Sequence, residues 1–153
     1  MELWRLCSAR HQAVAFTGLG ASLAGGRWNE RGVTVVYTAG SLALAALECL
    51  VHFSAQTLPD DYVSIVAVAP AGVSLETIDP ATLPSGWAEE DPPQTTRTLG
   101  TGWVRAQRSV LLKVPSAIIP TEFNYLINPQ HPDFARIRIG QAVPFRFDPR
   151  LKQ

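Results

Sequence analysis

The sequence has few of the residues that build metal sites, disulfide frameworks or membrane spans. Its 153 residues include only two cysteines, Cys7 and Cys49, which form no CxxC pair, and three histidines, which form no HExxH motif. We therefore expect no metal site and two reduced thiols in or near the core. The longest apolar run, residues 42–47, is too short to span a membrane, and the N-terminus does not resemble a signal peptide. These absences predict a cytoplasmic protein.

Charge is also scarce. Charged residues make up 17% of the chain and the formal net charge is zero, whereas about 25% is usual for globular proteins. A neutral chain is a poor candidate for binding nucleic acid by neutralising phosphates. Apolar residues account for 46%, and a chain of this length can bury a substantial core. We expect one domain over residues 1–153.

Short β-branched and aromatic runs predict a fold made mostly of strands. A single strong helix is expected at residues 42–53, with Ser41 as its N-cap, and it should be buried because it is apolar nearly all round. Residues 79–98 contain four prolines and predict a long irregular loop, followed by a short helix at 101–107. Strands are expected at residues 3–6, 33–38, 62–69, 109–114, 122–127 and 144–148. This pattern predicts an α+β domain with few helices, and without a GxGxxG motif it is not a Rossmann fold.

The first candidate site is the glycine-rich segment GGRWNERG. Residues 17–32 contain five glycines, which favour a loop whose backbone can approach a ligand. Arg27 and Arg31 lie within it, and a guanidinium can bind phosphate through two parallel hydrogen bonds. The alternative is a glycine-rich turn with solvated arginines. Tyr37, on the strand that follows, is by itself compatible with a core residue.

A carboxylate and a serine are the other candidates. Glu48 is the only residue between Ser41 and Phe53 that is certainly charged at neutral pH, so burial would be costly without a partner. It could pair with His52 one helical turn later or face a pocket. Ser116 follows Pro115 at the end of a predicted strand. No GxSxG surrounds it, so a nucleophile elbow is disfavoured, and a turn or capping role is the simpler interpretation.

Together these segments resemble the RES-domain toxin family. The resemblance rests on an ordered set of motifs that covers most of the chain: LWRL at 3–6, GGRWN at 25–29, VVYTA at 35–39, ALE at 46–48, GTGW at 100–103, LLKVPSAIIPTEFNYLINPQHPDF at 111–134 and FRFDPR at 145–150. The family's arginine, glutamate and serine match Arg27, Glu48 and Ser116. Tyr37 and Asn124 match further pocket positions, and Arg31 is a less firmly matched member of the set.

The resemblance implies a fold similar to ADP-ribosyltransferase toxins, with small antiparallel or mixed sheets around an NAD-binding cleft. It implies cleavage of the nicotinamide–ribose bond of NAD, with water, inorganic phosphate or a protein as acceptor. Glu48 would stabilise the ribosyl cation, Arg27 would hold the pyrophosphate, Tyr37 would pack against nicotinamide or ribose, and Ser116 would orient nicotinamide or Glu48. The implied partner is an Xre-like DNA-binding antitoxin that covers the active site.

Two other functions stay open at this point. A non-catalytic module of the same fold could bind a nucleotide, although the intact arginine, glutamate and serine set argues against it. A ribonuclease toxin would need a basic surface and a histidine pair that the sequence lacks. The number of chains in the assembly, a homodimer included, is not determined by the sequence.

Overall fold

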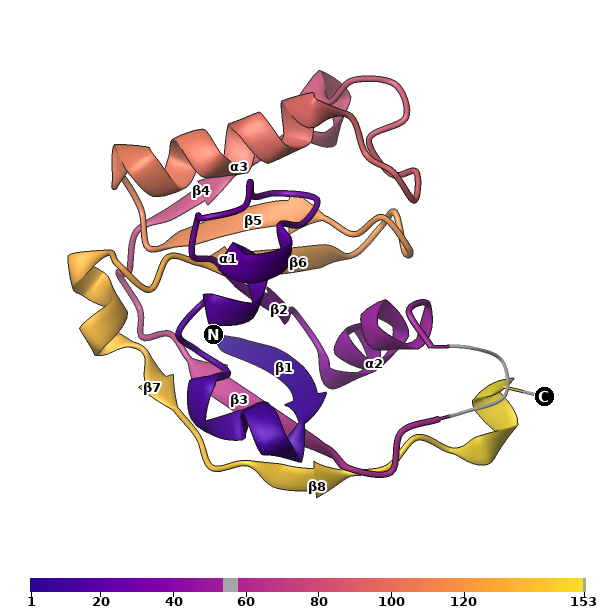
Figure 1. The fold of residues 1–153 in the computed structure, drawn as a ribbon. Coiled ribbons are helices and arrows are strands. Elements are labelled where there is room, and N and C mark those ends of the chain that lie inside the picture. The colour runs from indigo at the N-terminus through magenta and orange to yellow at the C-terminus, as the bar shows by residue number, and fades with distance from the viewer. Residues whose placement is uncertain (54–57, 153) are drawn as a thin grey trace.

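A computed structural model describes residues 1–53 and 58–152 (Figure 1). In these residues, a mixed sheet is ordered β4-β5-β6-β2-β1-β3-β7, and β8 pairs separately with β3. β4 and β5 are parallel and the other pairs are antiparallel. The strands are β1 (Glu2–Ser8), β2 (Val36–Ala39), β3 (Tyr62–Val68), β4 (Leu75–Thr77), β5 (Leu111–Pro115), β6 (Phe123–Ile127), β7 (Arg138–Ile139) and β8 (Val143–Phe145). The α-helices are α1 (Leu19–Ala24), α2 (Leu42–Leu50) and α3 (Gln94–Ala106), and short 3-10 helices occupy Ala9–Val14, Pro80–Thr82, Pro132–Arg136 and Pro149–Lys152.

The sheet divides into two halves that meet where β1 lies beside β2. Only one residue pair, Trp4 with Ala39, joins these strands, whereas β1 pairs with β3 along its whole length, from Glu2↔Val68 to Ser8↔Tyr62. Figure 1 shows β4, β5 and β6 in one half and β1, β3 and β8 in the other, with α2 at the end of the space between them. The α+β class with few helices, predicted from the sequence, is confirmed.

Helix α2 begins as the sequence predicts. The Ser41 hydroxyl accepts a hydrogen bond from the backbone N–H of Leu44 at 3.1 Å, which satisfies one of the free donors of the first turn. The prediction that this helix is buried all round is wrong. Leu44 is buried, but Leu47 and Val51 are 37% and 57% exposed. The helix packs one face on β1 and β2 and leaves the other open.

Helix α3 is the largest departure from the predicted elements. The expected loop at 79–98 gives way to this helix at Gln94, well before the predicted helix start at residue 101. Threonines and two glycines lower the helix propensity of this segment, so tertiary packing must compensate for it. Trp103 and Val104 pack against Leu112 and Val114 of β5 and cover one face of the sheet.

Other differences concern short elements. Part of the predicted glycine-rich loop forms α1, and the sequence did not predict β4 or β7. Both β7 residues are exposed, and two of the three β4 residues are exposed, so neither strand has the alternation of apolar and polar residues that marks a strand in a sequence. In the described part of the chain, no helix is both long and apolar enough to cross a membrane.

Candidate active site

Two polar side chains from different elements meet at the Glu48 carboxylate. Its Oε1 accepts a hydrogen bond from Ser116 Oγ at 2.8 Å and another from Asn124 Nδ2 at 2.5 Å. Glu48 lies on α2, Ser116 directly follows β5, and Asn124 lies on β6. Two donors on one oxygen hold the carboxylate in place and stabilise its charge. The structure therefore brings together the predicted glutamate, serine and asparagine.

Ser116 combines the two roles that the sequence left as alternatives. Its side chain is fully buried, and its Oγ accepts hydrogen bonds from the backbone N–H groups of Ile118 at 3.1 Å and Ile119 at 3.0 Å. The same hydroxyl donates to Glu48. Its proton must point to the carboxylate because the two N–H groups occupy its acceptor side. Ser116 is thus a turn residue that also orients Glu48.

Glu48 faces a cavity of about 410 Å³, within the usual range for small-molecule sites. The cavity lies between α2, the GGRW segment, the loop before α3 and the ends of β5 and β6. Its lining residues are Gly25, Gly26, Arg27, Trp28, Tyr37, Glu48, Val51, His52, Glu90, Pro92, Arg97, Pro115, Ala117, Ile118 and Asn124. The Oδ1 atom of Asn124 is buried and has no hydrogen-bond partner among the described residues. One acceptor at this site is therefore unused.

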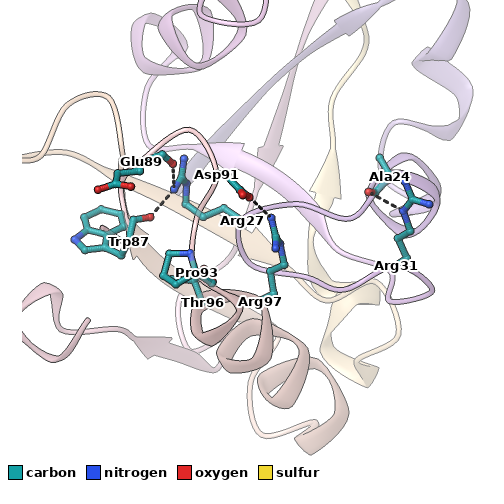
Figure 2. Close-up of polar contacts among 9 residues, drawn as sticks. All are labelled: Ala24, Arg27, Arg31, Trp87, Glu89, Asp91, Pro93, Thr96 and Arg97. Atoms are coloured by element: carbon teal, nitrogen blue, oxygen red, sulfur yellow. Dashed lines mark hydrogen bonds and ion pairs between the residues drawn. The ribbon is translucent and has the colours of Figure 1, made fainter. Parts of the chain in front are cut away.

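Arg27 lines the same cavity as Glu48 and is held by the loop before α3. Its guanidinium donates to the backbone carbonyl oxygens of Trp87 and, at 2.8 Å, of Glu89 (Figure 2). Burial lowers the pKa of Arg27, and the nearby Glu48 carboxylate raises it again. An arginine stays protonated in either case. The site therefore combines a fixed cation and a fixed anion in the lining of one cavity.

Tyr37 fixes the backbone that carries Arg27. Its hydroxyl donates to Asn29 Oδ1 at 2.7 Å and accepts from the Trp28 N–H at 3.0 Å. Burial raises the pKa of Tyr37 well above its usual value, so it remains a neutral hydrogen-bonding group. Asn29, fully buried, donates in turn to the carbonyl oxygens of Ala21, Glu30 and Val33. Asn29 belongs to the GGRWN motif, but the sequence alone gives it no role.

His52 does not pair with Glu48 among the described residues, and Arg31 lines a neighbouring cavity and not the main one. No ion pair joins Glu48 to His52 within residues 1–53 and 58–152; instead His52 lines the cavity. Arg31 is exposed and lies outside the main cavity, with its Nε 3.4 Å from the Ala24 carbonyl oxygen. It lines a second cavity of about 390 Å³, which adjoins the first at Gly25, Gly26 and Arg97. Arg31 therefore borders the site from the neighbouring cavity.

Arg5 is a charged residue that sequence reasoning passed over. It lies on β1, donates to the Tyr37 carbonyl oxygen at 2.8 Å, and its buried Nε has no hydrogen-bond partner among the described residues. Burial lowers its pKa. Arg5 lines a side cavity of about 220 Å³ that shares Tyr37, Glu48, His52 and Asn124 with the main one. The signal in the sequence is an arginine flanked by apolar residues in the LWRL segment at 3–6.

Cys49 also lines this side cavity, next to Glu48 in sequence. Burial raises the pKa of its thiol to about 11, so the thiol is protonated and unreactive near neutral pH. Among the described residues, no cluster of three histidine, cysteine, aspartate or glutamate side chains could hold a metal ion. The polar groups that face the main cavity instead suit an organic ligand with a negatively charged part and a part that becomes positively charged.

The fold is a small α+β fold in which a helix, a loop and the ends of two strands bring a carboxylate, an arginine, a serine and an asparagine to one cavity. The RES domain family model matches residues 2–148. The chain belongs to the RES domain family, and the resemblance predicted from the sequence is confirmed.

Named relatives cover almost the whole chain. A Prs ADP-ribosylating toxin of Sphingobium sp. (strain YBL2) is 41% identical over 154 residues, covering 98% of this chain and 96% of that protein. A protein named Toxin Res from Yersinia enterocolitica is 38% identical, covering 99% and 100% of the two chains. The crystal structure of the M. tuberculosis MbcT–MbcA toxin–antitoxin complex matches with a TM-score of 0.76 and 18% identity, over 99% of this chain and 86% of that chain. At that identity the likeness concerns the fold.

Proposed function

We propose that this protein is the toxin of a toxin–antitoxin pair and that it cleaves the nicotinamide–ribose bond of NAD. The observation that carries the proposal is the Glu48 carboxylate, held by Ser116 and Asn124 at the wall of a 410 Å³ cavity. The names of the relatives, an ADP-ribosylating toxin and proteins named Toxin Res, support the same function.

Glu48 has the properties that this reaction needs. As the bond from ribose C1′ to the nicotinamide nitrogen breaks, its electron pair leaves with neutral nicotinamide and positive charge develops on the ribose. A carboxylate held in advance near that carbon stabilises the charge without having to reorganise. The hydrogen bonds from Ser116 and Asn124 hold Glu48 in this way. The acceptor then bonds to C1′ and its nucleophilic atom loses a proton to the solvent.

Arg27 and Tyr37 support binding of the rest of the substrate. The Arg27 guanidinium lines the cavity and can exchange the two loop carbonyl oxygens for phosphate oxygens, which accept stronger, charge-assisted hydrogen bonds. Tyr37 lines the same cavity as Arg27 and Glu48 and offers an aromatic ring to nicotinamide or ribose. The unused acceptor Asn124 Oδ1 suits a ribose hydroxyl. We propose that residues 1–153 form a single domain, which supplies all five side chains of the site: Arg27, Tyr37, Glu48, Ser116 and Asn124.

The acceptor of the ADP-ribose is best identified by its products. Purified protein is incubated with NAD in plain buffer, with inorganic phosphate, and with cell extract, and products are identified by mass. We expect nicotinamide in every incubation in which NAD is cleaved. The second product identifies the acceptor: ADP-ribose indicates water, its 1″-phosphate indicates inorganic phosphate, and a modified protein indicates a protein target. NAD that binds but stays intact in all three arms would instead indicate a non-catalytic nucleotide-binding module.

We further propose an antitoxin partner, Xre-like and DNA-binding, that covers the cavity. An enzyme that consumes NAD harms its host unless it is held inactive, and the structural relative was solved as a toxin–antitoxin complex. Co-expression with the product of the neighbouring open reading frame should restore growth and give a stable complex that releases no nicotinamide. A stable complex that cleaves NAD at the full rate would contradict a partner that covers the site.

A further inference from the structure

Arg97 lies where two cavities meet. It is near the start of α3 and lines both the 410 Å³ cavity with Glu48 and the neighbouring 390 Å³ cavity with Arg31. Its side chain is 32% exposed, so it is accessible but partly sheltered. Gly25 and Gly26 line both cavities as well and form the rest of the shared wall. A ligand longer than one cavity would pass this point.

A second arginine, Arg27, lines the 410 Å³ cavity together with Arg97. Figure 2 shows Arg27 and Arg97 bound to the same segment before α3, which also carries Trp87, Glu89 and Asp91. The charge of Arg97 is close enough to lower the pKa of Arg27, in addition to the larger effect of burial. Like charges in a partly dry cavity repel each other, and an anion between them relieves the repulsion.

Neither arginine is bound to a buried carboxylate. Arg27 donates to neutral carbonyl oxygens, and Arg97 is 3.2 Å from Asp91, whose side chain is 97% exposed. An ion pair with so exposed a partner contributes little to stability because water solvates both charges. A phosphate can therefore replace these partners at small cost. The N-terminal end of α3 is nearby and adds a partial positive charge.

We propose that Arg97 and Arg27 together bind the pyrophosphate of NAD, and that the 390 Å³ cavity beside Arg31 takes the adenosine half. This assignment rests on the proposed function, and it names the residue that separates the two halves of the substrate. Glu48 then faces the nicotinamide ribose in the main cavity. Arg97 is a binding residue that does not touch the reacting carbon.

Binding of ADP-ribose tests this assignment without turnover, because ADP-ribose has the pyrophosphate but no bond to cleave. Calorimetry on the purified protein should show Arg97→Gln binding ADP-ribose about 10- to 100-fold more weakly than wild type, the range for one charge-assisted contact. Arg97→Lys should lose less, because it keeps the charge and loses only the planar fork. If the Arg97→Gln variant does not fold, the affinity of the Arg97→Lys variant for ADP-ribose tests the role of Arg97 instead.

Two controls separate binding from support of the loop. Arg108→Gln breaks another surface ion pair, with Glu76 at 2.8 Å, away from both cavities, and should leave ADP-ribose affinity unchanged. Asp91→Asn removes the competitor of Arg97 and should keep or raise the affinity. If Asp91→Asn weakens binding as much as Arg97→Gln, Arg97 acts only by holding the loop, and the assignment is overturned.

The outcomes also separate this inference from the proposed function. Wild-type protein that neither cleaves NAD nor binds ADP-ribose would refute the proposed function itself. Wild-type protein that binds ADP-ribose, together with a folded Arg97→Gln variant of equal affinity, would refute only the role of Arg97.

Discussion

Gly100 provides a sharp test of how α3 holds the active-site loop. A Cβ atom added at Gly100 would lie 1.9 Å from the backbone oxygen of Trp28 and 2.8 Å from its carbonyl carbon. Both are backbone atoms of the residue that follows Arg27, so they cannot move aside as a flexible side chain would. Gly102, on the same helix, has no atom within 4 Å of its added Cβ. The two glycines therefore form a matched pair.

The expected effects have opposite signs. Alanine is the better helix former by about 0.5–1 kcal/mol, and Gly102→Ala should gain this amount. Gly100→Ala gains the same propensity but must separate α3 from Trp28, and overpacking of this kind typically costs about 1–3 kcal/mol, occasionally more. For a domain of this size, 1 kcal/mol shifts the melting temperature by about 2–4 °C.

Thermal unfolding of the two variants, with nicotinamide release from NAD measured on the same samples, tests the prediction. Gly100→Ala should melt several degrees lower and lose activity even when folded, because Trp28 and with it Arg27 are displaced. Gly102→Ala should melt at or slightly above the wild-type temperature with normal activity. If Gly100→Ala melts no lower than Gly102→Ala, α3 does not pack on the Trp28 backbone as described.

Three further substitutions test separate contacts. Arg27→Ala should weaken NAD binding about 10- to 100-fold in calorimetry and change the melting temperature little, because only neutral loop carbonyls lose their donor; an unchanged Kd would limit Arg27 to holding the loop. Tyr37→Phe leaves the Trp28 N–H and Asn29 Oδ1 without their partner, so chemical denaturation should show a loss of about 1–3 kcal/mol, and a stability equal to wild type would refute that network. Burial raises the folded-state pKa of Cys49 from 9.0 to about 11. The contribution of the protonated thiol to the free energy of unfolding is therefore complete below pH 9 and is lost as the pH rises to 11. Cys49→Ala should reduce that alkaline loss by up to about 2–3 kcal/mol, and parallel stability curves for the two proteins would contradict the burial of the thiol.

The sequence predicted the main elements because their signals are local. The apolar, β-branched and aromatic residues of β2, β3, β5 and β6 and the Ser41 cap of α2 reflect backbone and side-chain preferences that act within a few residues. The start of α3 was missed because its glycines and threonines favour other local structures. Gly100 is needed for the approach to Trp28, a contact between residues far apart in the sequence. The G-x-G-W signature at 100–103 thus reflects packing that only the fold makes visible.

The candidate site also has residues that the sequence predicts and contacts that only the fold reveals. Arg27, Glu48, Ser116, Tyr37 and Asn124 were chosen by residue type and family resemblance, and in the structure they surround or support one cavity. Sequence spacing alone suggested His52 as the partner of Glu48, whereas the family resemblance implied that Ser116 could orient it. The fold brings Ser116 and Asn124 to the carboxylate, and the contact with Asn124 could not be predicted because it joins residues far apart in the sequence.

The arginines that the sequence missed have a common physical explanation. Arg97 occurs in a polar segment where an arginine is unremarkable, and only the packing of α3 beside the glycine-rich loop brings it to the cavities. Arg5 reaches Tyr37 across the junction of β1 and β2. Both depend on contacts between distant segments, which local sequence patterns do not encode.

The most direct test of the account compares wild type with Glu48→Gln in nicotinamide release from NAD. Glutamine keeps the oxygen that accepts from Ser116 and Asn124 but removes the negative charge. We expect turnover to fall roughly 100- to 1000-fold, the value of one preorganised electrostatic contact. ADP-ribose affinity should change only a few-fold, because the charge acts mainly on the transition state, and the melting temperature should hold or rise because a half-buried charge is gone. A Glu48→Gln variant that melts early while its folded fraction releases nicotinamide at the wild-type rate would assign Glu48 to the scaffold and contradict the mechanism.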